Sequence, residues 1–569
     1  MYEIRQHDVD TTAPAITDDE LRRRWAQFHG NIRMVSGNRL RRTVGRMLGE
    51  DTIRYHVARF FGRPILRVVR KVRGTKKPEP TSKVEIDAPE EVYFPINYRP
   101  HLLPRPERSI DALRSEDVTI VRVDETLSAD EAITALNNAV GIASTTWLLI
   151  ADVADAPGDA RLASEVLLTH ATANCDVVFA DEYGPTPYAP TLKSPAVGPH
   201  TLLSYNVVGR PALLRLATVR RVGGFSREAG WAYEHDLYLR LSELDATFLH
   251  VPALLLGGRR PLAFHRDHID ADTQRVVTAA MERRGWSGTV EAGAFPGLVT
   301  WRVDVPTPPP SIDIVIPTRD RVDLVRRCID AINDKTTYPN YDIIILDNDS
   351  VESETLDYFK TSPYRVVPCP GPFNYAHIVN RGVAHSNADF VVTLNNDTIV
   401  VTPDWLERLV GLAALPDVGF VGACLLDQEG RREHESIVIS PYPQHLRTDS
   451  NYWHADSFVN ATRNVAAVTG AVQMVERAWW NALGGMDESL RVVMNDVDIC
   501  LRSLVHGRYV VYTPDVQLYH HVSSSRGSLD PLEDRNRFIR RWDIFGTFVD
   551  PYFPESLLLL GETMYYKFR

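Results

Sequence analysis

The sequence contains little cysteine, no long apolar run and no excess of positive charge. Its 569 residues include five cysteines, scattered and without a CxxC pair, which argues against a disulfide framework and a zinc site. The net charge of −11 argues against a nucleic-acid-binding protein. The longest apolar stretches, such as residues 147–151 and 557–560, are too short to span a bilayer. The opening MYEIRQHDVD does not resemble a signal peptide, so we expect a cytoplasmic protein.

The length predicts several domains, because one hydrophobic core rarely serves more than about 250–300 residues. The hydrophobic content of 44% and charged content of 24% are typical of globular proteins. Two polar or proline-rich stretches, KKPEPTSKVEIDAPEE and VPTPPPS, suggest boundaries. We therefore expect a basic helical N-terminal region (1–80), an α/β domain (90–300), a second α/β domain (311–530) and a C-terminal extension (531–569).

One segment departs from the acidic average. Residues 39–77 contain thirteen Lys or Arg against two acidic residues, interleaved with apolar side chains at roughly helical spacing. A basic amphipathic helix can lie on an anionic membrane surface. The alternatives are a helical subdomain with a solvated basic face, or a contact in a homo-oligomer. The segment thus predicts peripheral contact with the inner face of the cell membrane, with these alternatives open.

From residue 312 the sequence alternates apolar strands with amphipathic helices. IDIVIPT, YDIIILDND and DFVVTLNND are separated by helical patterns such as RVDLVRRCIDAIND, which favours a parallel sheet covered on both faces. Ligands of such sheets bind beyond the carboxyl ends of the strands. Each strand ends in polar residues, so we expect a binding site along this edge.

Two of the polar stretches allow a structural and a chemical interpretation. In TLNNDT (393–398) three polar residues interrupt apolar sequence, and buried polar groups need partners. They either cap a turn or hold a ligand. In NDVDICLR (495–502) Asp496 lies in the first turn of a predicted helix. It is either a helix cap or a general base at a cleft.

Seven motifs in order resemble the family-2 glycosyltransferases, and in particular the bacterial rhamnosyltransferase-like and O-antigen biosynthesis group. They are IVIPTRDR, IIILDNDS, FNYAHIVNRGV, LNNDT, VTGAVQMV, NDVDICLR and YHHVSSSRG. The resemblance covers 311–527 and continues into DPYFPESLLL (550–559). It implies a GT-A fold, a nucleotide-diphosphate sugar donor (UDP- or dTDP-sugar) and a metal-dependent reaction that inverts the anomeric centre.

The resemblance also implies a metal site. LNNDT occupies the place of the family's DxD motif, so Asp397 is the expected ligand of Mn²⁺ or Mg²⁺, and Asn395 and Asn396 are expected to contact the donor. His520 is the expected second ligand, with His521 the less favoured neighbour. A divalent cation stabilises the charge that develops on the departing diphosphate, and Mn²⁺ accepts imidazole more readily than Mg²⁺ does.

The remaining site residues follow from the same motifs. Asp496 is the expected general base. Asp498 is expected either to support the helix start or to contact the acceptor, Trp405 either to border the acceptor or to pack, and Arg381 either to reach the diphosphate or to lie on a helix surface. Asp349 replaces the family's usual glycine, which puts the local turn in doubt. Further donor-site candidates are Pro317, Thr318, Arg319, Asp347, Asn348 and Asn374, and further acceptor-site candidates are Thr469 and Gly470.

The middle of the chain resembles a second, degenerate copy of the same domain. NNAVGIASTTWLLIADVAD (137–155) aligns with NRGVAHSNADFVVTLNNDT (380–398), VGGF with LGGM, and YEHDLYLR (233–240) with NDVDICLR. This alignment places Glu234 on Asp496, but Ala154 on Asp397 and Gly258 on His520. A one-residue shift would bring Asp155 to the metal position. We therefore expect an inactive copy that packs, dimerises or holds a long acceptor glycan.

Together these patterns predict an inverting glycosyltransferase that extends a cell-surface glycan or a lipid-linked glycan. One alternative is a protein acceptor. A second, of a different class, is a pseudoenzyme that binds glycan as a scaffold. A sugar nucleotidyltransferase is disfavoured, because PTRDRVDL has no glycine for a phosphate loop.

Overall fold

A computed structural model of the chain describes most residues from 117 onward. The described ranges are 92–95, 117–123, 127–152, 157–183, 191–257, 266–440, 442–447, 459–521, 531–545, 548–555, 557–560 and 563–568. The predicted basic region and its membrane contact at residues 39–77 lie outside these ranges. Within them, no helix combines the length and apolar character needed to cross a membrane.

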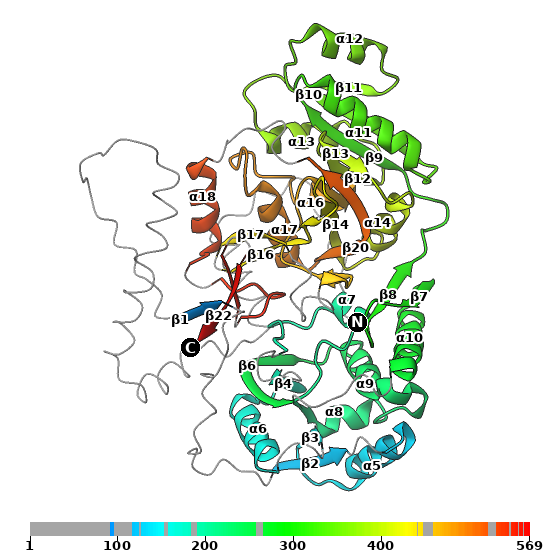
Figure 1. Cartoon of the computed structure of the whole chain (residues 1–569), viewed down its shortest axis with the longest axis vertical. Helices are drawn as coiled ribbons and strands as arrows, with labels where there is room; N and C mark the ends of the chain where they lie inside the picture. Colours follow the sequence, from blue (N-terminus) through cyan, green and yellow to red (C-terminus); the bar gives the residue numbers. More distant parts are fainter. Residues whose placement is uncertain are drawn as a thin grey trace, which may run out of the picture.

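The larger of two α/β units, named here the C-terminal unit (312–521), is built on a ten-stranded mixed sheet (Figure 1). Its main path runs β11-β10-β9-β12-β19-β14-β20-β13, with β15 beside β14 and β18 beside β20. The strands are β9 (Ile312–Thr318), β10 (Tyr341–Asp347), β11 (Arg365–Pro368), β12 (Phe390–Leu394), β13 (Thr398–Val400), β14 (Val418–Leu426), β15 (Arg432–His434), β18 (Arg463–Asn464), β19 (Val472–Glu476) and β20 (Tyr509–His520).

Helices cover both faces of this sheet, as the continuous apolar strands predict. α11 and α14 pack on one face, where Ile314 and Ile316 of β9 point. α13 and α17 pack on the other, against Val315. The helices are α11 (Val322–Lys335), α12 (Ser353–Thr361), α13 (Tyr375–Ala384), α14 (Trp405–Ala413), α16 (Arg477–Ala482), α17 (Asn495–Val505) and α18 (Leu532–Trp542). The α/β class is therefore confirmed, but the sheet is mixed, because β19 runs antiparallel between β12 and β14.

The N-terminal unit (117–257) has a five-stranded sheet in the order β2-β3-β5-β4-β6. Its elements are β2 (Val118–Val123), α5 (Ala129–Ile142), β3 (Trp147–Asp152), α6 (Pro157–His170), β4 (Val177–Tyr183), α7 (Pro199–Ser204), β5 (Ala212–Arg215), α8 (Leu216–Arg221), the 3-10 helix η2 (Arg227–Ala232), α9 (Tyr233–Ser242) and β6 (Phe248–Gly257). A segment of α10 (Arg266–Arg283), β7 (Gly288–Ala292) and β8 (Val299–Val303) then leads to the C-terminal unit.

The two sheets share one strand order and one set of directions. In the N-terminal unit β2 and β3 are parallel, β5 is antiparallel to both β3 and β4, and β4 is parallel to β6. In the C-terminal unit β9, β12, β19, β14 and β20 repeat this pattern in the same sequence order. The difference lies between the first two strands. β2 and β3 are joined through α5, whereas β9 and β12 enclose α11, β10, α12, β11 and α13.

Two side-chain networks recur at matching places. The Asn137 amide bonds both the N–H and the C=O of Phe225 (2.9 and 2.8 Å), as Asn380 bonds those of Met486 (2.8 Å each).

Arg240 bonds Asp236 and the carbonyls of Val222 and Gly224. Arg502 bonds Asp498, Leu483 and Gly485 in the same way. Each network ties a helix to a turn with two left-handed glycines, at 223–224 and 484–485.

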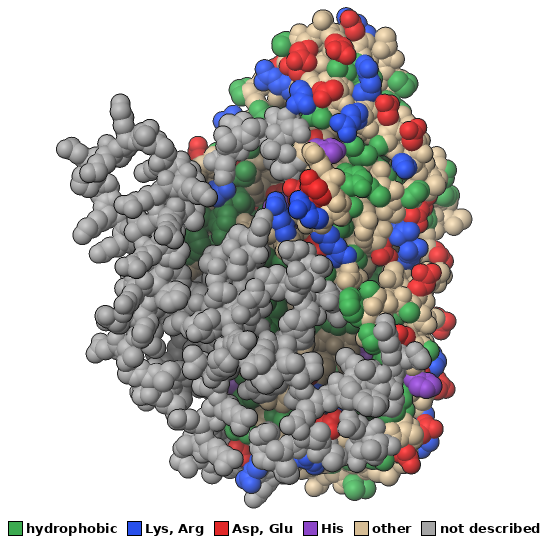
Figure 2. All heavy atoms as spheres, in the orientation of Figure 1, with side chains coloured by type: hydrophobic (Ala, Val, Ile, Leu, Met, Phe, Trp, Pro, Cys, Tyr) green, Lys and Arg blue, Asp and Glu red, His purple; other side chains and the backbone are tan. Residues whose placement is uncertain are grey.

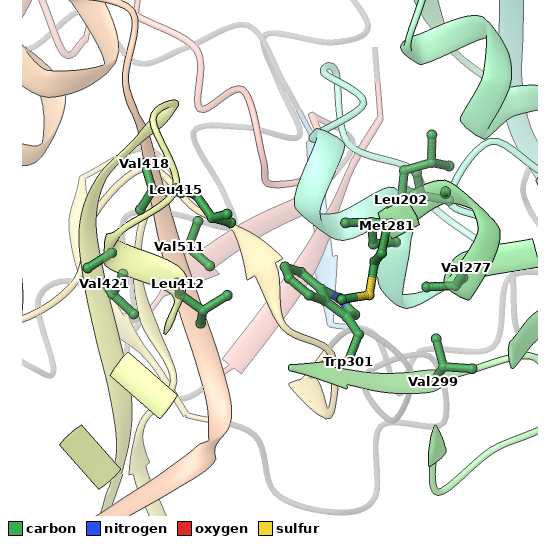
Figure 3. Close-up of a cluster of buried hydrophobic side chains, with 14 of the residues drawn as sticks. Leu202, Val277, Met281, Val299, Trp301, Leu412, Leu415, Val418, Val421 and Val511 are labelled. Atoms are coloured by element: carbon green, nitrogen blue, oxygen red, sulfur yellow. The ribbon is translucent and has the colours of Figure 1, made fainter. Parts of the chain in front are cut away.

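The two units meet through a continuous apolar core (Figure 3). Trp301 of β8 is 1% exposed and lies between Met281 and Leu202 on one side and the C-terminal sheet on the other (Figure 3). Its indole N–H donates to Ser204 Oγ (3.0 Å), and that hydroxyl donates to the Thr462 carbonyl (2.6 Å). A buried polar chain thus crosses the interface.

Terminal segments of the chain also pack on the C-terminal unit. Phe538 and Trp542 of α18 belong to its buried core. The short hairpin β16 (Ser436–Ile439) and β17 (Pro443–Leu446) is bound by Asp550, whose carboxylate accepts the Ile439 N–H (2.8 Å). A separate three-stranded sheet joins β1 (Val92–Pro95), β22 (Thr563–Phe568) and β21 (Leu557–Leu560).

Asn464 provides a test of the interface between the units. Its Oδ1 accepts the N–H groups of His200 (3.0 Å) and Thr201 (3.2 Å) in the first turn of α7. Asn464→Ala leaves both donors buried without this partner, so we expect a loss of about 2 kcal/mol or more in the free energy of unfolding.

Urea denaturation measures this loss. Asn481→Ala, on the exposed side of α16, is the matched control and should change stability by at most about 0.5 kcal/mol. Equal stability of the two variants would contradict a structural role for the Asn464 contact.

Candidate active site

The polar ends of three strands converge, as the sequence predicts. The Asn396 amide, after β12, donates to Thr318 Oγ1 at the end of β9 (2.9 Å). The Asn348 N–H, after β10, donates to the Thr318 carbonyl (2.9 Å). Pro317 is half-buried beside Thr318, and Arg319 is exposed at the mouth of this edge. The strand ends are therefore joined by one network of mostly buried hydrogen bonds.

The turn after β10 is stabilised by its own side chains. Asp347 Oδ1 accepts the Ser350 N–H (2.9 Å). The Asn348 amide, 2% exposed, donates to the carbonyls of Cys369 and Gly371. Asp349 has φ of 57°, a left-handed conformation that aspartate tolerates better than most residues. The turn therefore keeps a glycine-like backbone despite the substitution.

The FN…NRG segment is positioned mainly by contacts within the protein. Asn374 caps α13, accepting the His377 N–H (3.1 Å) and donating to the Glu488 carbonyl (2.9 Å). Arg381 Nε donates to the Pro368 carbonyl at the end of β11 (2.6 Å). Both side chains thus support the binding edge, and a direct contact with a donor stays a prediction.

Asp397 and His520 lie side by side, as expected of two ligands of one ion. β13 and β20 are antiparallel, with Thr398 opposite His520, and the Asp397 carbonyl accepts the His521 N–H (3.0 Å). Asp397 Oδ1 stands 3.4 Å from His520 Nε2, with side chains 5% and 13% exposed. This oxygen is buried and has no hydrogen-bond partner.

The residues fit a divalent cation. A buried carboxylate oxygen without a partner is costly unless a cation or donor meets it, and oxygen with imidazole is a suitable donor pair for Mn²⁺. In the described part of the chain no three His, Cys, Asp or Glu are arranged to hold a metal together. Asp397 and His520 are therefore the residues that would hold such an ion.

Asp496 is held at the first turn of α17 by backbone donors. The Gly470 N–H donates to Oδ2 and the Val497 N–H to Oδ1, both at 2.9 Å. The Gly470 carbonyl in turn accepts the hydroxyls of Tyr375 (2.8 Å) and Thr393 (3.1 Å). Asp496 keeps partial exposure, so its carboxylate is oriented by backbone donors without being fully buried.

The segment 469–471 links Asp496 to the turn that carries Asp397. The Asn395 N–H donates to the Ala471 carbonyl (3.1 Å), one residue from the Gly470 N–H that bonds Asp496. Thr469 is 7% exposed, and its hydroxyl accepts the Ala471 N–H (3.3 Å). The predicted metal ligand and the predicted base therefore belong to one hydrogen-bonded framework.

Two predicted acceptor contacts are wrong. Asp498 is 0% exposed, and its carboxylate accepts from Arg502 (2.8 Å), Arg541 (2.9 Å) and the Trp542 indole (3.0 Å). Trp405 is 0% exposed, and its indole donates to Thr336 (2.9 Å). Burial and complete pairing make both structural, in agreement with the alternatives of helix support and packing.

Sequence reasoning missed Glu433. This residue of β15 places Oε2 3.7 Å from His520 Nδ1, with its side chain 13% exposed. Burial raises the pKa of Glu433, while the neighbouring His520 lowers it. Nothing in the local pattern REHES marks this glutamate, because its position depends on the pairing of strands distant in sequence.

Asp498 makes the structural interpretation testable. Asp498→Asn removes the charge that pairs with Arg502 and Arg541, and breaking a buried pair costs about 3–5 kcal/mol. We expect a loss of that size in the free energy of unfolding, with no change in the KM for an acceptor. Asp357→Asn, where the carboxylate is 71% exposed beside Lys360, is the control and should cost at most about 0.5 kcal/mol. A stable Asp498→Asn protein with a raised acceptor KM would restore the acceptor role.

The chain is similar in sequence to a known family and to several known proteins. Residues 313–478 match the family model "Glycosyl transferase family 2". The chain is 32% identical over 458 residues to the uncharacterized protein y4gI of Sinorhizobium fredii, covering 75% of this chain and 50% of that one. It is 31% identical over 388 residues to the O-antigen biosynthesis protein RfbC of Myxococcus xanthus, covering 65% of this chain and 30% of that one. The chain thus spans half or less of these two relatives.

A shorter match and two structures complete the comparison. An N-acetylglucosaminyl-diphospho-decaprenol L-rhamnosyltransferase of Mycobacterium tuberculosis is 24% identical over 211 residues, covering 32% of this chain and 68% of that one. The crystal structure of GalNAc-T7 with UDP, GalNAc and Mn²⁺ covers 42% of this chain and 49% of that one, with 15% identity and a TM-score of 0.35. The mannosyltransferase PcManGT of Pyrobaculum calidifontis with GDP-Man and Mn²⁺ covers 43% and 72%, with 18% identity and a TM-score of 0.30.

Both TM-scores are low, so the family resemblance depends on the family model and the sequence relatives. Residues 313–478 lie within the C-terminal unit and include the Asp397 turn and the Gly470 segment. Residues 313–478 therefore resemble a glycosyltransferase domain of family 2.

Proposed function

We propose that this chain is an inverting, metal-dependent glycosyltransferase of GT-A fold. It moves a sugar from a nucleotide-diphosphate donor, a UDP- or dTDP-sugar, to a hydroxyl of a cell-surface or lipid-linked glycan. The observation that carries the proposal is the buried Asp397 oxygen, which has no hydrogen-bond partner and stands 3.4 Å from His520 Nε2. The O-antigen and rhamnosyltransferase names of the relatives support the glycan acceptor.

The chain's own residues account for the steps of such a transfer. When bound, Mn²⁺ or Mg²⁺ stabilises the charge that develops on the leaving diphosphate. Thr318, Asp347 and Asn396 line the edge that would receive the nucleoside and sugar. The carboxylate of Asp496 takes the proton of the acceptor hydroxyl while its oxygen forms the bond to the anomeric carbon. The bond from that carbon to the diphosphate breaks on the opposite face, and the nucleotide leaves with the electron pair.

We further propose that the N-terminal unit is a truncated, inactive copy. The shared strand order and the recurring Asn137 and Arg240 networks support duplication, and the missing counterparts of β10 and β11 explain the loss of a donor site. Glu234, at the position of Asp496, is 7% exposed and bound by Arg210 through Nε (2.9 and 3.1 Å). A carboxylate so paired is not available as a base. The metal-position counterparts Ala154 and Gly258 lie outside the described residues.

Several expectations stay predictions. These are the cytoplasmic location, the membrane contact through residues 39–77 and the homo-oligomer. On the face drawn in Figure 2, acidic and basic side chains of the described residues are interspersed over the C-terminal unit. The protein acceptor and the glycan-binding scaffold remain the alternatives that activity assays separate.

Asp496 is the first test. Asp496→Asn keeps the shape of the side chain but cannot take a proton, so we expect transfer to fall by at least about 100-fold while donor binding persists. Turnover and donor affinity are measured on the same preparation. Glu234→Gln is the matched control in the other unit, and its activity per folded molecule should equal that of the natural protein. Near-normal turnover of Asp496→Asn would remove this residue as the base.

A second test concerns the metal dependence and the identity of the donor. A thermal-shift screen of nucleotide sugars with Mn²⁺ should show one donor that raises the melting temperature, because ligands that bind the folded state stabilise it. Asp397→Ala should abolish the Mn²⁺-dependent shift. Calorimetry with the selected donor then measures the lost affinity. A shift that survives Asp397→Ala, or that is the same without Mn²⁺, would contradict the metal assignment.

A further inference from the structure

Glu433 lies on the far side of the His520 ring from Asp397. His520 Nε2 is 3.4 Å from Asp397 Oδ1, and His520 Nδ1 is 3.7 Å from Glu433 Oε2. The imidazole therefore stands between two carboxylates, and the side chains that carry them are only 5% and 13% exposed. Glu433 Oε1 faces Arg447 Nη2 at 3.6 Å.

The hydrogen-bonding capacity of the ring does not satisfy both carboxylates. Asp397 Oδ1 and Glu433 Oε2 are both buried without a hydrogen-bond partner. A neutral imidazole carries one N–H and one lone pair, so it can serve only one of these oxygens. If Glu433 accepts the N–H from Nδ1, then Nε2 presents its lone pair toward Asp397, where a cation is needed.

The backbone places Glu433 there through a β-bulge. In the pairing of β14 with β15, Leu425 is opposite His434 and Leu426 is opposite Arg432, so Glu433 is the extra residue. Bulges re-aim a side chain and are common beside active sites. β14 also pairs with β20, with Leu426 opposite Tyr519. One strand, β14, therefore lies between the bulge and the strand that carries His520.

We propose that Glu433 is a positioning residue for the metal site. Its carboxylate, 3.7 Å from His520 Nδ1 in the structure, closes on the Nδ1–H when a cation is bound, and so fixes the tautomer whose Nε2 faces Asp397 and would hold the cation with it. Histidine ligands of metals commonly donate their other N–H to a carboxylate, which sets ring orientation and ligand basicity. Glu433 acts through His520 and is not itself a ligand, since it faces Nδ1 while Asp397 faces Nε2 on the other side of the ring. This role rests on the metal dependence proposed above.

The experiment measures Mn²⁺ affinity directly. Free Mn²⁺ is followed by its electron paramagnetic resonance signal during titration of the full chain, alone and with UDP or dTDP. Glu433→Gln should weaken Mn²⁺ binding by about 10- to 100-fold. Glu429→Gln, on the same hairpin with its side chain 65% exposed, is the control and should bind Mn²⁺ normally. The metal-free melting temperature verifies that each variant folds, and Glu433→Ser is the second variant if the first does not.

A double-mutant cycle separates positioning from direct ligation. In a His520→Ala background, Glu433→Gln should cause no further loss, because the carboxylate acts only through the ring. An equal loss in both backgrounds would overturn the positioning role. Natural protein that binds Mn²⁺, together with a Glu433→Gln variant of unchanged affinity, would overturn the role of Glu433 alone. Failure of the natural protein to bind Mn²⁺ under either condition would overturn the proposed metal dependence and this inference with it.

Discussion

The antiparallel pairing of β13 with β20 is the constraint on which the site depends. This pairing places Thr398 opposite His520. A shift of the register by one residue would turn each side chain of the strand to the other face of the sheet. The register brings a carboxylate and an imidazole, 123 positions apart in the chain, to 3.4 Å. Backbone hydrogen bonds on either side of Asp397 hold it there, so the chemistry is built on the rigidity of the sheet.

Much of this arrangement could be predicted from the sequence. Apolar strands ending in Thr318, Asp347 and Asn395 to Asp397 indicate a polar edge, because the carboxyl ends of parallel strands meet. The complete burial of Asp498 and Trp405 could not be predicted, since it depends on tertiary contacts. Asp498 is buried by Arg541 and Trp542, more than forty residues further along the chain. The position of Glu433 could not be predicted either, because a β-bulge does not change the hydrophobic periodicity of the sequence in a recognisable way.

The two units share some side-chain contacts and differ in others. The two side-chain networks recur in both units with nearly the same distances, around Asn137 and Asn380 and around Arg240 and Arg502. They therefore stabilise the helix–turn packing of either unit. The carboxylates at positions 234 and 496 differ in surroundings. Arg210 neutralises Glu234, whereas backbone N–H groups alone hold Asp496. A buried guanidinium converts a potential base into a structural ion pair.

The contact of Asn464 with α7 has a consequence for engineering. Asn464 lies on β18, and five residues later the chain reaches Thr469 and the Gly470 that holds Asp496. The interface contact and the segment that holds Asp496 are therefore consecutive parts of one short stretch of backbone. A chimaera that joins this C-terminal unit to another glycosyltransferase would lose the support of that stretch. Transplanting its specificity requires moving both units together, with Trp301 between them.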